Sequence, residues 1–280
     1  MLKNEEIKKI EDFVAEKPRS VHEIAEFLGI SWRTADRYLE QIKLELGTIE
    51  TRVFREGTRG ALKIVFLTGV EKVSHSAFQQ DLEKQILEAK SKEDFSAFDI
   101  YQHVPDKNKK VKIEKSPTSG MDLEEFVTQL EQAQKQVLLF SGNLSLINLK
   151  DKKYEMFKVF EGLVKRKVSV KVLCRVDLAG KENVEKLLSL NFKYGKEVVE
   201  IKHCEHPIRA SVIDSHIFRI QEINEPTGKI NELAKKLFVF YTIKDKDWIA
   251  WISRIFWKRF SSAIGANKRL EELNKLNFRD

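Results

Sequence analysis

The chain has 280 residues, of which 42% are apolar and 33% are charged, so it can form two packed domains and is not a disordered polymer. Its 50 basic and 43 acidic residues give a formal net charge of +7, a basic bias that is compatible with nucleic acid but does not indicate it alone. We expect no signal peptide, because the first helical segment is acidic, and no apolar run approaches the roughly 20 residues that span a bilayer.

Residues 1–68 are predicted to form a first domain of three helices and a hairpin. The helices are expected at 5–17, 20–29 and 31–46. Ser20 followed by Glu23 is a capping-box pattern, Gly29 predicts the end of the second helix, and Ser31 is an N-cap for the third. Strand-like runs at 48–56 and 62–69 flank a turn with two glycines. This order is typical of a winged helix-turn-helix.

The third helix would be the recognition helix of such a domain. Arg33 and Arg37 lie one turn apart, so both could reach phosphates or guanine edges in a major groove. "IAEFLGISWRTADRYLEQI" followed by "GTIETR" resembles the winged helix-turn-helix of many prokaryotic regulators. The predicted DNA-binding residues are Ser31, Trp32, Arg33 and Arg37 in this helix, and Arg52, Arg55 and Arg59 in the hairpin.

The net charge of residues 1–67 is zero, from 12 basic and 12 acidic residues. DNA binding would therefore depend on a local patch, and a domain that serves protein contact alone is the alternative.

Residues 69–120 are predicted to be a helix, at 76–90, followed by a lysine-rich linker or exposed arm at 104–120.

In residues 121–280, predicted strands alternate with predicted helices. Strands are expected at 136–142, 168–176, 197–204 and 237–243, with a hairpin at 209–221 and a long aromatic helix near 246–264. This alternation favours an α/β sandwich with a largely parallel sheet. The fold class is thus α/β overall, with an α+β winged domain at its start. The aromatic stripe of the last helix is expected to be core or a dimer contact, and less a stacking platform.

"HPIRASVID", residues 206–214, resembles the His-x-Lys-x-x-x-x-Asp motif of the phospholipase D superfamily and departs from it. In that superfamily the histidine attacks phosphorus and the lysine neutralises phosphate charge. Here Arg209 lies five residues before Asp214, in place of the lysine, and Pro207 occupies the nucleophile's position. His206 is one residue further out, which turns its side chain to the opposite face of an extended strand. We therefore expect a related fold without hydrolysis and without a cofactor.

A winged helix-turn-helix followed by a non-catalytic phospholipase D-like domain resembles the TrmB family of regulators. The resemblance implies a cytoplasmic, DNA-binding transcriptional regulator that forms a homodimer, and whose second domain serves dimerisation or binds a small-molecule or anionic effector. The weak ligand-binding candidates are Ser141, Asn143, His206, Arg209 and Asp214. A phosphodiesterase or nuclease that uses His206 and Arg209, and an interaction module without DNA affinity, are the alternatives.

The two cysteines, Cys174 and Cys204, form no CxxC pair and no disulfide framework, which is typical of a reducing cytosol. Together with His203 and His206 they would approach a metal only if their strands were neighbours. Alternate strand residues point to opposite faces, so we predict polar strand ends and no metal site.

Overall fold

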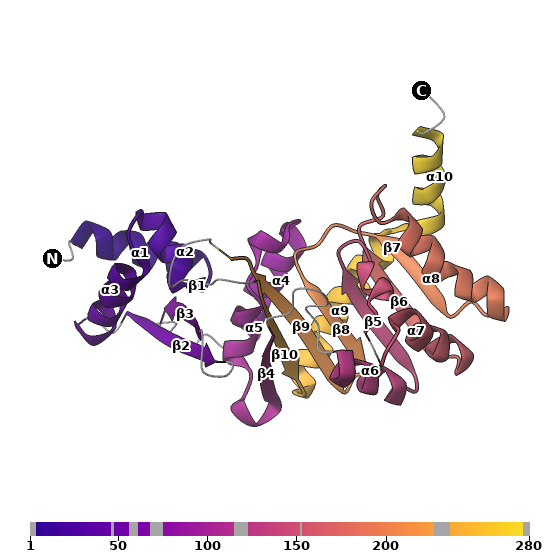
Figure 1. Cartoon of the computed structure of the whole chain (residues 1–280), viewed down its shortest axis with the longest axis horizontal. Helices are drawn as coiled ribbons and strands as arrows, with labels where there is room; N and C mark the ends of the chain where they lie inside the picture. The colour runs from indigo at the N-terminus through magenta and orange to yellow at the C-terminus, as the bar shows by residue number, and fades with distance from the viewer. Residues whose placement is uncertain are drawn as a thin grey trace.

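The structure is a computed structural model that describes residues 4–45, 48–55, 61–67, 75–114, 123–151, 153–226 and 236–276. A small N-terminal unit lies beside a larger domain built on one sheet (Figure 1). Among these residues, no helix combines the length and apolar character that a membrane span requires.

The N-terminal unit is the expected three helices and hairpin. Its elements are α1 (Asn4–Glu16), β1 (Arg19–Ser20), α2 (Val21–Leu28), α3 (Trp32–Glu45), β2 (Ile49–Arg55) and β3 (Ala61–Leu67), and its strands lie in the order β1-β3-β2. The capping box is confirmed: the Glu23 backbone N–H donates to Ser20 Oγ (3.1 Å), and the Ser20 N–H donates to Glu23 Oε2 (2.7 Å). Gly29 ends α2 at a φ of 65°, in the left-handed region that favours glycine. Ile10, Ile24, Ala35, Leu39 and Ile42 form its core.

Residues 104–114 are not a linker, so that interpretation was wrong for them, while residues 115–120 of the predicted segment lie outside the described residues. After α4 (His75–Glu88), η1 (Lys92–Asp94), α5 (Ala97–His103) and η2 (Asp106–Asn108), the chain enters strand β4 (Lys109–Glu114). β4 pairs with β10 at the edge of the large sheet, where Ile113 is its one buried residue. An edge strand tolerates lysines because they face solvent, so the polar composition concealed the strand. The sheet domain therefore begins before residue 121.

The remaining elements are α6 (Leu123–Gln132), β5 (Gln136–Ser141), η3 (Ser145–Asn148), α7 (Met156–Lys165), β6 (Ser169–Cys174), α8 (Lys181–Tyr194), β7 (Val199–His203), β8 (Arg209–Ile213), β9 (Ile217–Asn224), β10 (Leu237–Ile243), α9 (Lys246–Ser262), β11 (Ile264–Gly265) and α10 (Ala266–Leu276). The eight-stranded sheet has the order β11-β7-β6-β5-β8-β9-β10-β4. Only β5, β6 and β7 are parallel, so the largely parallel sheet we expected is a mixed one. In the other half of the sheet, β8, β9 and β10 pair antiparallel in chain order, and a short turn joins β8 to β9.

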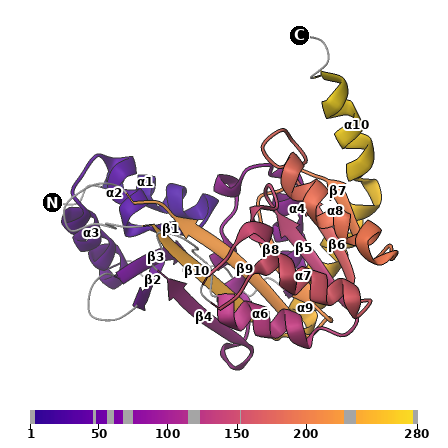
Figure 2. The ribbon, with the colours of Figure 1, turned by 45° about the vertical axis from the view of Figure 1, so that its right-hand side comes forward.

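Helices cover both faces of the sheet (Figure 2). One face packs with α6, α7 and α8, and the other packs with α4, α5 and α9. The aromatic stripe of α9 is core, since Trp248, Trp251 and Phe256 are all buried. The sequence interpretation did not include α10, which extends beyond the edge of the sheet in both views and packs Ala266, Leu270 and Leu273 into the core on the α8 side.

Candidate nucleic-acid interface and ligand pocket

The N-terminal end of α3 presents two exposed arginines. Arg33 and Arg37 are both exposed, while Ala35 and Leu39 of the same helix are buried. Ser31 is exposed and caps the helix, because its Oγ accepts from the Thr34 N–H (3.2 Å). The remaining N–H groups of the first turn, together with the helix dipole, favour an anion there. This face has the charge and exposure that contact with phosphates or base edges requires.

Two neighbours of these arginines, Trp32 and Asp36, are only partly exposed. Trp32, the first residue of α3, is half-buried and packs against the N-terminal core. Asp36 is held by Lys63 of β3, at 2.7 Å, and the same lysine pairs with Glu40. These ion pairs join α3 to the hairpin, so the exposed face of α3 that is free for contacts is narrower than predicted.

The hairpin faces the second domain with one side. Phe54 of β2 packs among the rings of Phe98, Tyr101 and Tyr241, at centroid distances of 6.0 to 6.3 Å. The guanidinium of Arg52 lies 5.1 Å from the Tyr101 centroid, so this residue contacts the second domain and not a free groove, contrary to the prediction. The side chain of Arg55, and all of Arg59, lie outside the described residues.

The degenerate motif lies where it was expected, at the start of β8. Pro207 is buried, and the His206 Nε2 is 3.1 Å from the Leu173 carbonyl oxygen, to which the neutral ring donates. The ring also packs edge-on against Phe140. Burial lowers the pKa of His206 to about 4. His206 is therefore a neutral, packed side chain. It does not line the pocket described below, but it lines a neighbouring cavity that shares Ser141, Gly142 and Arg209 with that pocket.

Asp214 is not a ligand-binding residue, and that prediction was wrong. It follows β8 at the end opposite to Arg209, and its carboxylate accepts from the backbone N–H groups of Gln134, Lys135 and Gln136 at 2.6 to 2.8 Å. Burial raises its pKa, but these hydrogen bonds more than offset that effect, and the pKa is lowered. The carboxylate joins the end of β8 to the start of β5.

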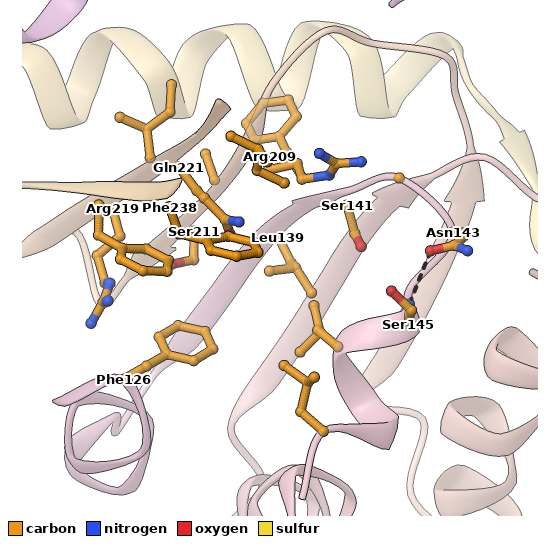
Figure 3. A pocket seen from close by; sticks show the side chains of 18 residues that line it. Phe126, Leu139, Ser141, Asn143, Ser145, Arg209, Ser211, Arg219, Gln221 and Phe238 are labelled. Atoms are coloured by element: carbon orange, nitrogen blue, oxygen red, sulfur yellow. Dashed lines mark hydrogen bonds between the residues drawn. The ribbon is translucent and has the colours of Figure 1, made fainter. Parts of the chain in front are cut away.

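Three predicted residues do meet in one pocket. Ser141 and Asn143, at the end of β5, and Arg209, at the start of β8, line a cavity of about 240 Å³ between the sheet, α6 and η3 (Figure 3). The Arg209 guanidinium lies next to Gly142: a Cβ there would be 3.6 Å from Nη2. Burial lowers the pKa of Arg209, which nevertheless stays a cation.

The pocket also contains residues that the sequence interpretation missed. Arg219 and Gln221 of β9 pair with Ser211 and Arg209 of β8, so the four side chains share one face of the sheet. The alternation of these polar residues along "RASVIDSHIFRIQ" was the available signal, since residues two apart in a strand point to the same face. The apolar part of the lining is Phe126, Leu139, Phe140, Leu146, Leu149, Ala210, Ile220, Ile223, Phe238 and Phe240.

The cysteine and histidine cluster does not converge. Cys174 is opposite His203 on neighbouring strands, but His203 Nδ1 accepts from the Val176 N–H (2.9 Å), and burial raises the pKa of Cys174 to about 12. The Cys204 sulfur lies 3.7 Å from Arg259 Nη1. Within the described ranges there is no group of three or more side chains that could hold a metal ion.

No protein-family model and no curated protein matches the chain. Among solved structures, TrmBL2, an archaeal chromatin protein with a novel mode of DNA binding, is 16% identical with a TM-score of 0.38, over 94% of this chain and 93% of that chain. Nuc, a phospholipase D family member from Salmonella typhimurium, is 10% identical with a TM-score of 0.40, over 56% of this chain and 97% of that chain. NucT from Helicobacter pylori is 12% identical with a TM-score of 0.38, over 56% of this chain and 99% of that chain.

Identities this low give no residue-level correspondence, so the role of each residue comes from its own geometry. The chain is similar over most of its length to TrmBL2, and over about half of its length to phospholipase D family members.

Proposed function

We propose that the chain is a DNA-binding transcriptional regulator that contacts DNA with the N-terminal half of α3. The observation that supports this most is the exposure of Arg33 and Arg37, one turn apart on a helix whose other side is buried. Ser31 and the free N–H groups of the first turn would meet a phosphate, and the two guanidinium groups would meet phosphates or guanine edges. Arg55 and Arg59 of the hairpin are proposed as flanking phosphate contacts, and Arg52 is not.

The test is a gel-shift titration of the full chain at two salt concentrations. Replacing Arg33→Ala and Arg37→Ala together should weaken binding by roughly 30- to 1,000-fold, because each lost contact costs about 1–2 kcal/mol, and should reduce the salt slope. The control is Arg254→Ala with Lys258→Ala on α9, two exposed cations that pair only with Glu83 among the described residues. It removes the same charge and should leave affinity nearly unchanged.

Equal loss in both double variants would mean that net charge, and not α3, governs binding. A wild-type chain with no gel shift at either salt concentration would favour the interaction module.

The sheet domain is proposed to be non-hydrolytic. Pro207 offers no nucleophile, and the His206 ring is held by Leu173 and Phe140 in a buried site. Purified chain should release no product from labelled DNA or from a generic phosphodiester. Turnover that disappears in His206→Ala would overturn this proposal.

A homodimer is the proposed assembly, since two-fold symmetry would present two α3 helices to successive major-groove faces about 34 Å apart. Light scattering of the full chain should give twice the 32.7 kDa chain mass. Fragments selected from random DNA should contain half-sites one helical turn apart, or a multiple of that distance. A monomer mass both free and on DNA would contradict the assembly.

A further inference from the structure

The pocket between the sheet, α6 and η3 is lined by 18 residues, of which two are arginines and none is acidic. It lies at the junction of the two halves of the sheet, on β5, β8, β9 and β10. Figure 3 shows the Arg209 guanidinium near Ser141, while Arg219 lies at the opposite side of the pocket. A lining of this charge favours a negative ligand.

The two arginines are not equivalent. Arg219 is buried, its Nη1 donates to Gln129 Oε1 (3.2 Å), and its guanidinium lies 5.2 Å from the Phe126 centroid and 5.7 Å from the Phe240 centroid. Arg209 is partly buried and has neither a hydrogen bond nor an ion pair with any residue that the structure describes. Removing a cation from water without a partner costs free energy, which an anion beside it would offset.

Neutral hydrogen-bonding groups surround Arg209. Gln221 of β9 is paired directly with Arg209 of β8. Ser141 lies on the other side, in β5, where the preceding residue Phe140 pairs with Ala210. The side chains of Ser141, Ser211 and Gln221 line the cavity and make no hydrogen bond within the described part of the chain. A planar guanidinium with neutral donors on both sides is suited to a carboxylate, which it can bind through two parallel hydrogen bonds.

The opposite wall is apolar, and the cavity is small. Phe126, Leu139 and Phe238 face the arginine across a volume of about 240 Å³, below the roughly 300–1,000 Å³ of pockets for drug-sized ligands. The ligand therefore needs a compact apolar body. One unpaired guanidinium balances one negative charge, which fits a carboxylate better than a phosphate monoester with a charge of about −1.5 to −2.

We propose that this pocket binds a small amphipathic monocarboxylate, with its carboxylate at Arg209 and its apolar body between Phe126, Leu139 and Phe238. Arg209 also lines a second cavity, whose far wall is Lys17, Pro18, Arg19 and Glu23 of the N-terminal unit. When the ligand binds, the Arg209 guanidinium moves toward its carboxylate. The lining of the second cavity, between the sheet domain and the N-terminal unit, then changes. Ligand binding then alters DNA affinity, a consequence that rests on the proposed function.

The first experiment measures ligand binding by thermal shift and calorimetry on the full chain without DNA, at matched ionic strength. The compounds are phenylacetate, phenyl phosphate, inorganic phosphate and the neutral 2-phenylethanol. Phenylacetate at ten times its Kd should raise Tm by roughly 3–5 °C. The other three should bind at least tenfold more weakly. Equal or tighter binding of phenyl phosphate, inorganic phosphate or 2-phenylethanol would overturn the proposal.

Variants test the two halves of the pocket separately. Arg209→Gln should abolish the phenylacetate shift, whereas Arg175→Gln, a more exposed arginine outside this cavity, should keep it. Phe238→Ala should weaken phenylacetate at least fivefold and leave the weak response to inorganic phosphate unchanged, which keeps the test valid if Arg209→Gln does not fold. Undiminished phenylacetate binding in Arg209→Gln or Phe238→Ala would overturn the assignment.

The second experiment repeats the gel shift with saturating phenylacetate. DNA affinity of the wild-type chain should change at least threefold, and that of Arg209→Gln should not change. Unchanged wild-type affinity would overturn the coupling while ligand binding stands. A chain that binds phenylacetate but no DNA would instead contradict the proposed function, so the two failures are distinguishable.

Discussion

Asp214 ends the segment that resembles a phospholipase D motif, and in the structure its carboxylate hydrogen-bonds to the backbone. Its two oxygens accept from three consecutive backbone N–H groups, at Gln134, Lys135 and Gln136. Its φ of 48° lies in the left-handed region, which aspartate and asparagine tolerate better than other non-glycine residues. The carboxylate of Asp214 therefore has a structural role at the junction of β8 and β5.

Asp214→Asn should destabilise the chain by about 1–3 kcal/mol, since an amide has one oxygen and must direct its NH₂ at a backbone donor. The pKa of Asp214 is lowered in the fold, so its contribution is present above its ordinary pKa of about 4 and is lost as the pH falls further. Urea unfolding at pH 7 and pH 3 should show the two chains converging at the lower pH. A constant difference would contradict this role.

Glu222 is a buried carboxyl near the boundary of the two units. It accepts from Ser96 Oγ (3.1 Å) and from the Tyr241 hydroxyl (3.4 Å). Burial raises the pKa of Glu222 to about 7. Burial also raises the pKa of Asp99, and the negative charge of Glu222 adds to that effect. Because the folded chain holds this proton more tightly than the unfolded chain, the stability from Glu222 is present at low pH and is lost as the pH rises.

Between pH 4.5 and pH 7 the wild-type chain should lose up to about 3 kcal/mol of its free energy of unfolding as Glu222 ionises. The Glu222→Gln variant should not show this loss. The measurement is the free energy of unfolding at pH 5 and pH 8 in both chains. The control is Glu225→Gln, whose parent side chain is 53% exposed. If Glu222→Gln keeps the wild-type pH dependence, the carboxyl is ionised in the fold and this account is wrong.

Among the elements, β4 joins the middle segment to the sheet. It extends the sheet beyond β10 through six paired residues, from Lys109 opposite Ile243 to Glu114 opposite Phe238. Four of its six residues are charged, as is common in edge strands, which must not pair with other chains. Only Ile113 is buried, so one side chain supplies most of its hydrophobic contribution.

Ile113→Ala should destabilise the chain by about 2 kcal/mol through lost burial and the cavity that remains. Lys112→Ala, one residue away on the opposite face, should change stability by less than about 0.5 kcal/mol. Thermal unfolding of both variants measures the difference. If the segment were a linker, the two substitutions would have the same small effect on stability. That result would contradict the assignment of β4 as a strand of the sheet.

At the scale of the whole molecule, the hairpin connects the winged unit to the sheet domain. Phe54, Leu62 and Ile64 belong to the same hydrophobic cluster as α5 and α9. The contact uses one face of the hairpin, while α3 remains exposed on the other side of its unit. The two units are therefore positioned by an apolar contact close to the proposed DNA-binding elements.

Phe54→Ala should cost about 3–5 kcal/mol and separate unfolding into two transitions, because the packed rings of Phe98, Tyr101 and Tyr241 lose their partner. Calorimetry of the full chain measures both effects. Val53→Ala is the matched control, since Val53 is 42% exposed and faces away. A single transition with a loss similar to the control would mean that the contact does not couple the units.

The sequence by itself determined the local elements of this protein. The capping box at Ser20, the glycine at the end of α2 and the hairpin of β8 and β9 are encoded by neighbouring residues, and all three were predicted. The presence of Pro207 where the resembled motif has a histidine is also readable without a structure, because it concerns one position of the sequence.

Only the tertiary structure decided which of these residues meet. Arg209 and Asp214 are five residues apart, but a strand places them at opposite ends of β8, so one lines a pocket and the other joins two strands. Arg52 contacts Tyr101, and β4 joins a sheet whose other strands begin more than 20 residues later. Such contacts depend on the order of strands across a sheet, which residue periodicity does not encode.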